Sequence, residues 1–313
     1  MKLSVVIATR GDNYGGDPAA KAVKFTRRLI KKMAKIGENS YEVILVDYNF
    51  VETNRIKHVI PVEMLEFVKI IEVPRSHLKD FASEQVPFIE FHAKNIGIKR
   101  AKGAQILVAN SDVVISRKLL LACLHRPYLN SSYLRADRTD LTRKSRFRML
   151  ATLQIRNGET HDDPMQLKLK NLRFFIGSKR FTNEIRINSY IVSREGGDSN
   201  FPLFGAYGNA AGDFLCAPNW AWMEARGYQE SKFRTFMGDS FLLCAFLQLG
   251  LRQVILPGLG RLVHLDHLRP IDHRTNWGEL NWISFQEDFN AVVIGKNPYK
   301  TPNETWGEFA RPE

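Results

Sequence analysis

Short apolar runs rich in β-branched residues recur through the first third of the chain, and they predict buried strands at residues 3–8, 41–47, 68–73 and 104–109. The segments between these runs have helical spacing. Asp17 and Pro18 form a helix start, an N-cap residue followed by a proline in the first turn. Apolar residues then recur every three or four positions as far as Ile36, and Gly37 ends the predicted helix. A second helix is expected over about residues 88–102.

This alternation of strands and helices predicts an α/β fold with a mostly parallel sheet flanked by helices. Strands that are apolar throughout are typical of parallel sheets covered on both faces. Ligands of such sheets bind beyond the carboxyl ends of the strands. We therefore expect the polar side chains at those ends to converge on one crevice: Thr9, Arg10, Asp12, Asp47, Asn49, Asn110 and Asp112.

The last third of the chain begins with glycine-rich loops, and a helix is predicted from about Asn219. Asp239 and the serine after it open an apolar helix that ends at Gly250, and a strand follows over residues 253–256. After this strand comes a loop that contains three histidines, His264, His267 and His273.

The composition is that of a globular protein with an excess of positive charge. The 313 residues are 44% hydrophobic and 25% charged, which excludes a disordered or collagen-like chain. The length suits one large α/β domain or two smaller ones. The net charge is +12, and residues 117–186 hold 16 Lys and Arg against 6 Asp and Glu. An anionic partner is expected, whether nucleic acid, an anionic membrane or a phosphate-bearing molecule.

Cysteine usage and hydropathy indicate a cytoplasmic protein. The three cysteines have apolar neighbours and form neither a CxxC pair nor a zinc-ligand spacing, which is typical of buried thiols that stay reduced. The apolar run at the N-terminus is too short for a signal peptide, and the longest later run, residues 241–251, is about half a membrane span. Peripheral attachment to the inner face of a membrane stays compatible with these features.

The candidates for chemistry are acids and histidines at predicted strand and helix ends. The sequence has no Walker A, GxGxxG or GxSxG motif. Asp112 follows a buried strand and could bind a hard divalent cation, although an Asn-Ser-Asp cluster is also typical of a turn. Asp239 fits either a helix N-cap or a general base. His264 fits either a metal ligand or a structural histidine.

Taken in order, these segments resemble GT-A-type glycosyltransferases of the nucleotide-diphospho-sugar transferase superfamily, especially family 2. The matching segments are 4–10, 42–49, 93–103, 110–112, 212–214, 226–228 and 238–240, followed by His264. The match spans about residues 3–112 and 205–267. The resemblance implies a GT-A (Rossmann-like) fold. It also implies transfer of a sugar from a UDP- or GDP-linked donor to an acceptor hydroxyl, with inversion at the anomeric carbon.

The resemblance implies binding roles on the donor side of the site. The nucleoside would lie against the polar residues that follow the first two strands, Thr9, Arg10, Asp12, Asp47 and Asn49. Lys94 and Asn95 take the place of an Arg-Asn pair near the diphosphate.

Further roles implied by the resemblance concern the metal and the acceptor. Asp112 matches the last acid of the DxD motif, which anchors a divalent cation, Mn²⁺ or Mg²⁺, together with the diphosphate. Asn110 stands at the first position of that motif, and His264 would complete the metal sphere. Asp239 would deprotonate the acceptor hydroxyl.

Three parts of one domain follow from this assignment. Residues 1–116 form the half that binds the nucleotide sugar, residues 117–200 a basic insertion on the acceptor side, and residues 201–313 the acceptor-binding and catalytic half. The excess charge lies in the insertion, which favours an anionic acceptor or a membrane-associated lipid carrier over nucleic acid.

Two departures from the family pattern leave alternatives open. Asn110 replaces the first acid of DxD, and Gly238 replaces the acid that usually precedes Asp239. A catalytically inactive GT-A-like module that binds a nucleotide or a glycan would also fit the sequence. A nucleic-acid-binding protein is a third hypothesis, because phenylalanines are interspersed among the basic residues of 117–186.

Overall fold

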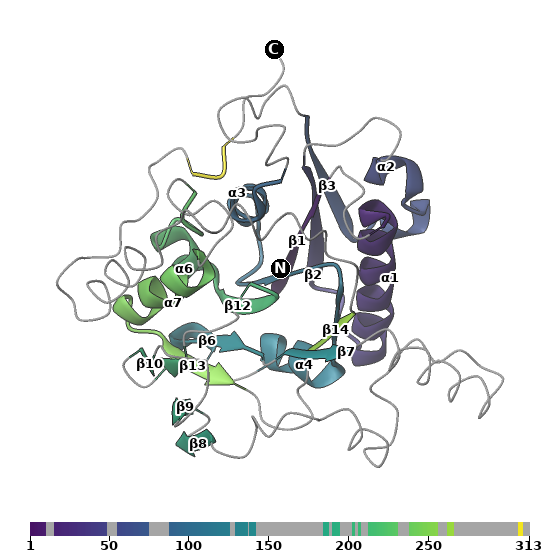
Figure 1. Ribbon diagram of the computed structural model, residues 1–313. Coiled ribbons are helices and arrows are strands. Elements are labelled where there is room, and N and C mark those ends of the chain that lie inside the picture. Colours follow the sequence, from purple (N-terminus) through teal and green to yellow (C-terminus); the bar gives the residue numbers. More distant parts are fainter. Residues whose placement is uncertain are drawn as a thin grey trace.

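The computed structural model (Figure 1) describes residues 1–10, 16–48, 55–74, 88–125, 129–136, 138–141, 184–187, 190–194, 202–203, 206–207, 212–230, 238–255, 262–265 and 306–308. Its centre is a seven-stranded sheet in the order β13-β6-β12-β4-β1-β2-β3. The bounds of these strands are β1 (Leu3–Arg10), β2 (Tyr41–Tyr48), β3 (Val68–Val73), β4 (Gln105–Ala109), β6 (Ser132–Arg135), β12 (Phe214–Pro218) and β13 (Arg252–Ile255).

The sheet is mostly parallel, which confirms the predicted fold class. Strands β1 to β4 run parallel to their neighbours in the β4-β1-β2-β3 part of the sheet, and β13 runs parallel to β6. Strand β12 is antiparallel to its two neighbours, β4 and β6. The sequence predicted no strand at 214–218, because that run is short and ends in Pro218, which weakens a strand assignment.

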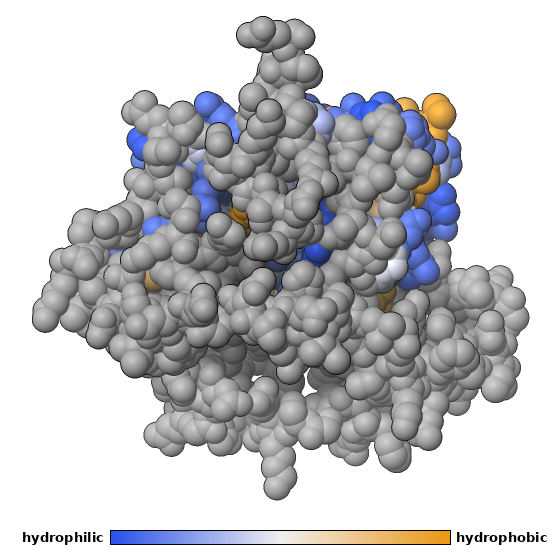
Figure 2. Space-filling view, turned by 45° about the horizontal axis from the view of Figure 1, so that its top comes forward, coloured by the Kyte–Doolittle hydropathy of each residue, from blue (hydrophilic) through white to orange (hydrophobic). Residues whose placement is uncertain are grey.

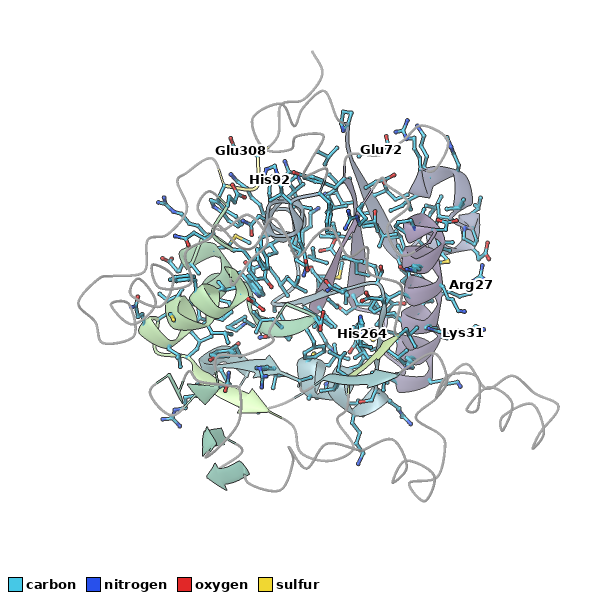
Figure 3. The ribbon with its side chains drawn as sticks, in the orientation of Figure 1. Arg27, Lys31, Glu72, His92, His264 and Glu308 are labelled. Carbon is cyan, nitrogen blue, oxygen red and sulfur yellow. The ribbon has the colours of Figure 1, made fainter. Side chains whose placement is uncertain are left out.

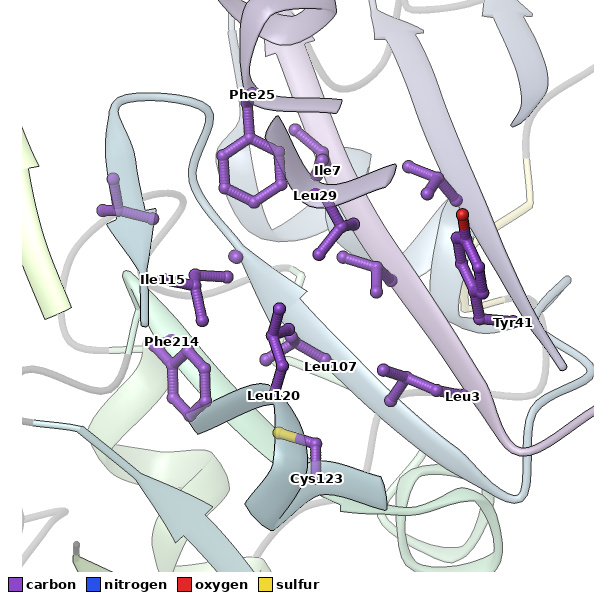
Figure 4. Packing of buried hydrophobic residues seen from close by; sticks show 14 of the residues in the cluster. Leu3, Ile7, Phe25, Leu29, Tyr41, Leu107, Ile115, Leu120, Cys123 and Phe214 are labelled. Atoms are coloured by element: carbon purple, nitrogen blue, oxygen red, sulfur yellow. The ribbon is translucent and has the colours of Figure 1, made fainter. Parts of the chain in front are cut away.

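Helices cover both faces of the sheet (Figure 1). One face packs against α1 (Pro18–Ile36) and α4 (Arg117–His125), and the other against α3 (Glu90–Ile98), α6 (Asn219–Glu224) and α7 (Gly238–Gln248). Side chains alternate along β1, so that Ile7 packs on the α1 face and Val6 on the α3 face. Figure 4 shows the α1 face, where Ile7, Phe25 and Leu29 fill the space between the helix and the sheet.

Helix α1 forms as its sequence predicts. The Asp17 carboxylate accepts a hydrogen bond from the Ala20 N–H at 2.9 Å, and Gly37 ends the helix in the left-handed region, with φ of 77°. The exposed side of α1 carries basic residues, among them Arg27 and Lys31 (Figure 3). The helix predicted over 88–102 is shorter than expected, because α3 ends at Ile98 and turns follow.

A separate three-stranded sheet, in the order β5-β14-β7, lies beside the main one. It contains β5 (Val113–Ile115), β14 (Leu262–Leu265) and β7 (Arg138–Leu141). Two two-stranded sheets pair β8 (Glu184–Ile187) with β9 (Tyr190–Arg194) and β10 (Pro202–Leu203) with β11 (Ala206–Tyr207). The remaining elements are the short helices α2 (Ile56–Val59), η2 (Val62–Met64) and η4 (Leu129–Ser131).

The surface is mainly polar where Figure 2 shows described residues, with apolar atoms on the α2 side. The large apolar side chains exposed there are Val59, Val62 and Leu65. The three cysteines are buried and form no disulfide, as their apolar neighbours predict. Across the described ranges, none of the helices combines the length and the apolar character that spanning a membrane requires.

Candidate active site

The polar strand ends meet at one edge of the main sheet. Thr9 at the end of β1 is the register partner of Asp47 at the end of β2, and β4 pairs with β1 on the other side. Because β12 is antiparallel to β4, with Phe214 opposite Ala109, the residues just before β12 reach this same edge. The edge therefore combines residues of the donor-side and acceptor-side segments.

Asp47 is a buried acid at this edge, with 1% of its surface exposed. Its Oδ2 accepts a hydrogen bond from the Ile56 N–H at 3.0 Å. Burial raises the pKa of Asp47 from 3.8 to about 6, although this hydrogen bond and the Arg55 charge oppose the rise. Arg55 in turn forms an ion pair with Glu72 on β3. A buried carboxyl group whose pKa is raised by desolvation, at the edge where ligands of parallel sheets bind, is a candidate functional residue.

Thr9 and Arg10 lie next to Asp47. The Thr9 hydroxyl donates to the Val46 carbonyl at 3.1 Å, which ties β1 to β2. The Arg10 guanidinium lies 5.3 Å from the centre of the Phe88 ring, and Phe88 packs edge-on against Tyr48 at 5.7 Å. This part of the edge thus presents a cation beside aromatic rings. Asp12 and Asn49, predicted for the same site, lie outside the described residues.

Asn110 follows β4 and contacts Asp213, which precedes β12. The Asn110 side-chain amide donates to the Asp213 carboxylate at 2.8 Å. Because a carboxylate only accepts, the amide nitrogen of Asn110 faces Asp213 and its carbonyl oxygen faces away from it. Asp213 lies in segment 212–214 of the family resemblance, but it was not predicted as a site residue. The candidate acids were those that follow predicted strands or start a helix, whereas Asp213 precedes an antiparallel strand.

Gly212 joins two further predicted residues. The Lys94 ammonium donates to the Gly212 carbonyl at 2.8 Å and forms an ion pair with Glu90. The Gly212 N–H donates to Asp239 Oδ2 at 3.0 Å. The structure thus brings Lys94, Asp239 and Asn110 together on two consecutive residues, Gly212 and Asp213, although they come from α3, α7 and the end of β4.

Asn95 lies away from this junction and is fully buried. Its amide donates to the Tyr228 carbonyl at 2.7 Å and to the Glu230 carboxylate at 2.8 Å, and its carbonyl accepts from the Tyr228 N–H at 2.8 Å. A side chain on Gly227 would overlap the side-chain oxygen of Asn95, Oδ1, so the turn needs glycine there. Asn95 therefore holds the 226–228 turn, and its role beside a diphosphate stays a prediction.

Asp112 and His264 lie side by side at the start of β5. His264 pairs with Val113 across the β5–β14 ladder, and the Leu265 N–H donates to the Asp112 carbonyl at 2.8 Å. His264 Nε2 is 3.4 Å from Asp112 Oδ2, and the two side chains are 4% and 19% exposed.

This pair fits two neighbouring positions around a cation. Adjacent oxygen ligands of an octahedral ion lie roughly 3 Å apart, given metal–ligand distances of about 2.1 Å. A carboxylate with an imidazole suits Mn²⁺ better than Mg²⁺, which prefers oxygen. Among the residues that the structure describes, no three His, Cys, Asp or Glu side chains form a complete metal site. A cation held by Asp112 and His264 would therefore need ligands from elsewhere, such as diphosphate oxygens.

A solved structure of a GT-A-type glycosyltransferase shares this backbone arrangement. S. aureus TarS 1–349 matches over 95% of this chain and 82% of that one, with a TM-score of 0.52 and 14% identity. In its complex with UDP, the match covers 85% of this chain and 61% of that one, less than two thirds of its length, with a TM-score of 0.48 and 14% identity. For the catalytic domain of Drosophila β1,4-galactosyltransferase 7 with xylobiose, the coverages are 98% and 82%, the TM-score 0.46 and the identity 9%.

No protein-family model matches the sequence, and neither does any curated protein. The structural match to TarS 1–349 shows the fold: this chain has the GT-A-type, Rossmann-like fold of nucleotide-sugar glycosyltransferases. The fold that the order of the sequence segments implied is thereby confirmed.

Proposed function

We propose that this protein is a glycosyltransferase that moves a sugar from a nucleotide-diphosphate donor to an acceptor hydroxyl. The observation that carries the proposal is the position of Asp239. Its carboxylate starts α7 and accepts a hydrogen bond from the Gly212 N–H, at the sheet edge where the buried acid Asp47 also lies. In a GT-A fold this edge is where ligands are expected, beyond the carboxyl ends of the strands.

On the donor side, Thr9, Arg10 and Asp47, with Asp12 and Asn49, would hold the base and ribose of a UDP- or GDP-sugar. Asp112 and His264, with Asn110 beside them, would hold Mn²⁺ or Mg²⁺. When bound, such a cation neutralises the charge that develops on a departing diphosphate. Together these residues would bind and orient the donor.

Asp239 would act as the general base. A carboxylate oxygen takes the proton of the acceptor hydroxyl while that oxygen forms a bond to the anomeric carbon, and the bond from this carbon to the diphosphate breaks. The attack comes from the side opposite the leaving group, so the configuration inverts. The Gly212 N–H holds Oδ2 in place at 3.0 Å, which helps to orient the carboxylate.

The test is the Asp239→Asn variant, assayed for donor binding and for turnover with the donor that the wild-type protein uses. Asn keeps an oxygen for the Gly212 N–H but cannot take a proton at neutral pH. We expect an unchanged dissociation constant for the donor and a turnover at least ~10²-fold lower, the lower end for lost general acid–base catalysis.

Asp17→Asn is the matched control, because Asp17 caps the start of α1, and its substitution should leave turnover unchanged. Full activity of Asp239→Asn would leave Asp239 with a structural role alone, as an acid in the first turn of α7 that accepts from the Gly212 N–H.

A second candidate is an inactive GT-A-like module that binds a nucleotide or a glycan. It is favoured by Asn110, which stands at the position where the family pattern has an acid. The side-chain amide of Asn110 donates to the Asp213 carboxylate. Nucleotide binding without hydrolysis or transfer of any donor sugar would support this candidate over the enzyme.

The acceptor that suits the charge distribution is anionic. Residues 117–186 carry most of the net positive charge, so a phosphorylated lipid carrier or a charged glycan would be attracted to this part of the chain. A cytoplasmic protein at the inner face of a membrane would meet such an acceptor.

A further inference from the structure

Lys94 and Asp239 contact the same residue from two different helices. Lys94 on α3 donates to the Gly212 carbonyl at 2.8 Å, and Asp239 at the start of α7 accepts from the Gly212 N–H at 3.0 Å. Helices α3 and α7 cover the same face of the sheet (Figure 1). Gly212 therefore joins these two charged side chains through its own peptide groups.

The Lys94 ammonium is enclosed and its contacts are defined. Its side chain is 1% exposed and forms an ion pair with Glu90. The nitrogen also lies 5.8 Å from the centre of the Phe91 ring and 6.0 Å from that of Tyr228. A buried charge is tolerated only when it is paired and hydrogen-bonded in this way. Moving the ammonium to a diphosphate would break these contacts and leave Glu90 and the Gly212 carbonyl without their cation.

We propose that Lys94 is a positioning residue for Asp239, acting through the backbone of Gly212, and that it is not a ligand of the diphosphate. The carbonyl and the N–H of Gly212 belong to the two peptide groups that meet at its Cα, so the bond from Lys94 restrains the residue whose N–H donates to Oδ2 of Asp239. An added Cβ on Gly212 would lie 3.4 Å from Oδ2, an ordinary contact distance, so Gly212 is packed closely against the carboxylate of Asp239. This inference rests on the proposed function, in which Asp239 is the base.

The kinetic test separates positioning from donor binding. Lys94→Met should lower kcat at least ~10-fold, because small displacements of a catalytic group cost one to two orders of magnitude in rate. The dissociation constant for the donor should stay within about twofold. If Lys94 acts only through Asp239, the double variant Lys94→Met/Asp239→Asn should be no slower than Asp239→Asn alone.

A diphosphate ligand would behave differently. In that case Lys94→Met would weaken donor binding at least ~10-fold, and its effect would multiply with that of Asp239→Asn. Either result overturns the proposal. Lys102→Met is the control for loss of one positive charge near α3, and it should change neither kcat nor the dissociation constant for the donor.

A second measurement does not depend on activity. In protein labelled with ¹⁵N-glycine, the Gly212 amide resonance, assigned with Gly212→Ala, should shift with pH as the carboxylate that accepts its hydrogen bond titrates. In Lys94→Met this pH-dependent shift should fall by at least half, and in Lys102→Met it should persist. An unchanged shift in Lys94→Met contradicts the coupling. If Lys94→Met does not fold, Lys94→Gln, whose shorter amide does not reach as far as the ammonium, takes its place.

The two measurements keep the failures apart. If the wild-type protein binds and turns over no donor, the proposed function fails, while the Gly212 resonance still decides whether Lys94 orients the contact to Asp239. If donors are turned over and the kinetic effects multiply, the positioning role alone fails.

Discussion

Asp47 costs the folded protein stability at neutral pH, because its carboxylate is buried at the end of β2. Burial raises its pKa from 3.8 to about 6. Because the folded-state pKa is above the unfolded value, the contribution of Asp47 to stability is most favourable below pH 3.8 and is lost as the pH rises through 6. The loss is about 3 kcal/mol, because a tenfold change in proton affinity corresponds to about 1.4 kcal/mol. Retaining such a residue is consistent with a binding role.

Asp47→Asn should therefore be more stable than the wild-type protein at pH 8, by up to about 3 kcal/mol, and the advantage should vanish near pH 4. The amide has no charge to desolvate, and its oxygen can still accept from the Ile56 N–H. Urea denaturation at several pH values measures this, with Glu63→Gln as an exposed control that should stay within about 0.5 kcal/mol. Lower stability of Asp47→Asn at pH 8 would contradict the account. If Asp47 binds the nucleoside, the same substitution weakens donor binding.

Asn110 shows how a departure from a family pattern can be explained by a neighbour. An aspartate at this position would place its carboxylate against that of Asp213, where the Asn110 amide now donates at 2.8 Å. Two carboxylates at that distance cannot both stay charged without a cation between them. Asp213, more than a hundred residues later in the chain, thus places a carboxylate beside Asn110.

At the scale of elements, Trp306–Glu308 form a C-terminal clasp on α3. Within the clasp, the Gly307 carbonyl accepts from Arg100 and the Glu308 carboxylate accepts from Lys99, each at 2.8 Å. His92 in α3 bonds the Glu308 carbonyl at 3.1 Å through one ring nitrogen and the Tyr48 hydroxyl at 2.9 Å through the other (Figure 3). His92 therefore links the clasp to the end of β2.

Gly307→Ala should detach the clasp. Gly307 has φ of 62°, and an added Cβ would lie 2.6 Å from the backbone carbonyl oxygen of Asn95. Gly250→Ala is the matched control, because Gly250 has φ of 82° and nothing within 4 Å of such a Cβ. Both substitutions strain the backbone, but only the first adds a clash, so we expect Gly307→Ala to lose at least about 1 kcal/mol more stability. Denaturation monitored by tryptophan fluorescence compares the stabilities of the two variants. Equal losses of stability would show that the clasp does not constrain Gly307.

The same elements show how far the sequence predicts the fold. Local signals defined α1, from the cap at Asp17 to Gly37, and the strands β1 to β4 within two residues at either end. No local signal identified β12 as an antiparallel strand at the centre of the sheet. The clasp could not be predicted either, because its contacts join residues that are about two hundred positions apart.

The candidate site also contains residues that the sequence predicted and contacts that it did not. Residues after strands were selected because parallel strands end at one edge, and the structure brings Thr9, Asp47 and Asn110 to that edge. Segment 212–214 belongs to the family resemblance, but the contacts of Gly212 and Asp213 could not be predicted, because they depend on the direction of β12. The predicted roles of Asp112, His264 and Asp239 in catalysis stay predictions.

At the scale of the whole molecule, positive charge is concentrated in residues 117–186, with 16 Lys and Arg against 6 Asp and Glu. We expect replacement of Arg143, Lys144, Arg146 and Arg148 by glutamine to reduce binding to vesicles with anionic lipid at least ~10-fold, since each basic residue near such a surface contributes about 1 kcal/mol. Sedimentation with vesicles at low and at physiological salt measures this binding. These four residues lie outside the described ranges.

The control removes the same number of charges from α1, at Lys24, Arg27, Lys31 and Lys35, and should have the smaller effect if the insertion holds the acceptor. If both variants lost vesicle binding equally, the insertion would contribute only through its net charge. Tighter binding to an oligonucleotide than to vesicles would favour a nucleic-acid-binding protein instead.

The central claim, that the protein binds a nucleotide-sugar donor at the sheet edge, is tested most directly by isothermal titration of the full chain with UDP- and GDP-sugars, with and without Mn²⁺. We predict saturable binding of at least one donor, tighter with Mn²⁺ and weakened at least ~10-fold, or about 1.4 kcal/mol, in Asp47→Asn. The absence of binding to every donor, with and without the cation, would contradict the assignment as a glycosyltransferase.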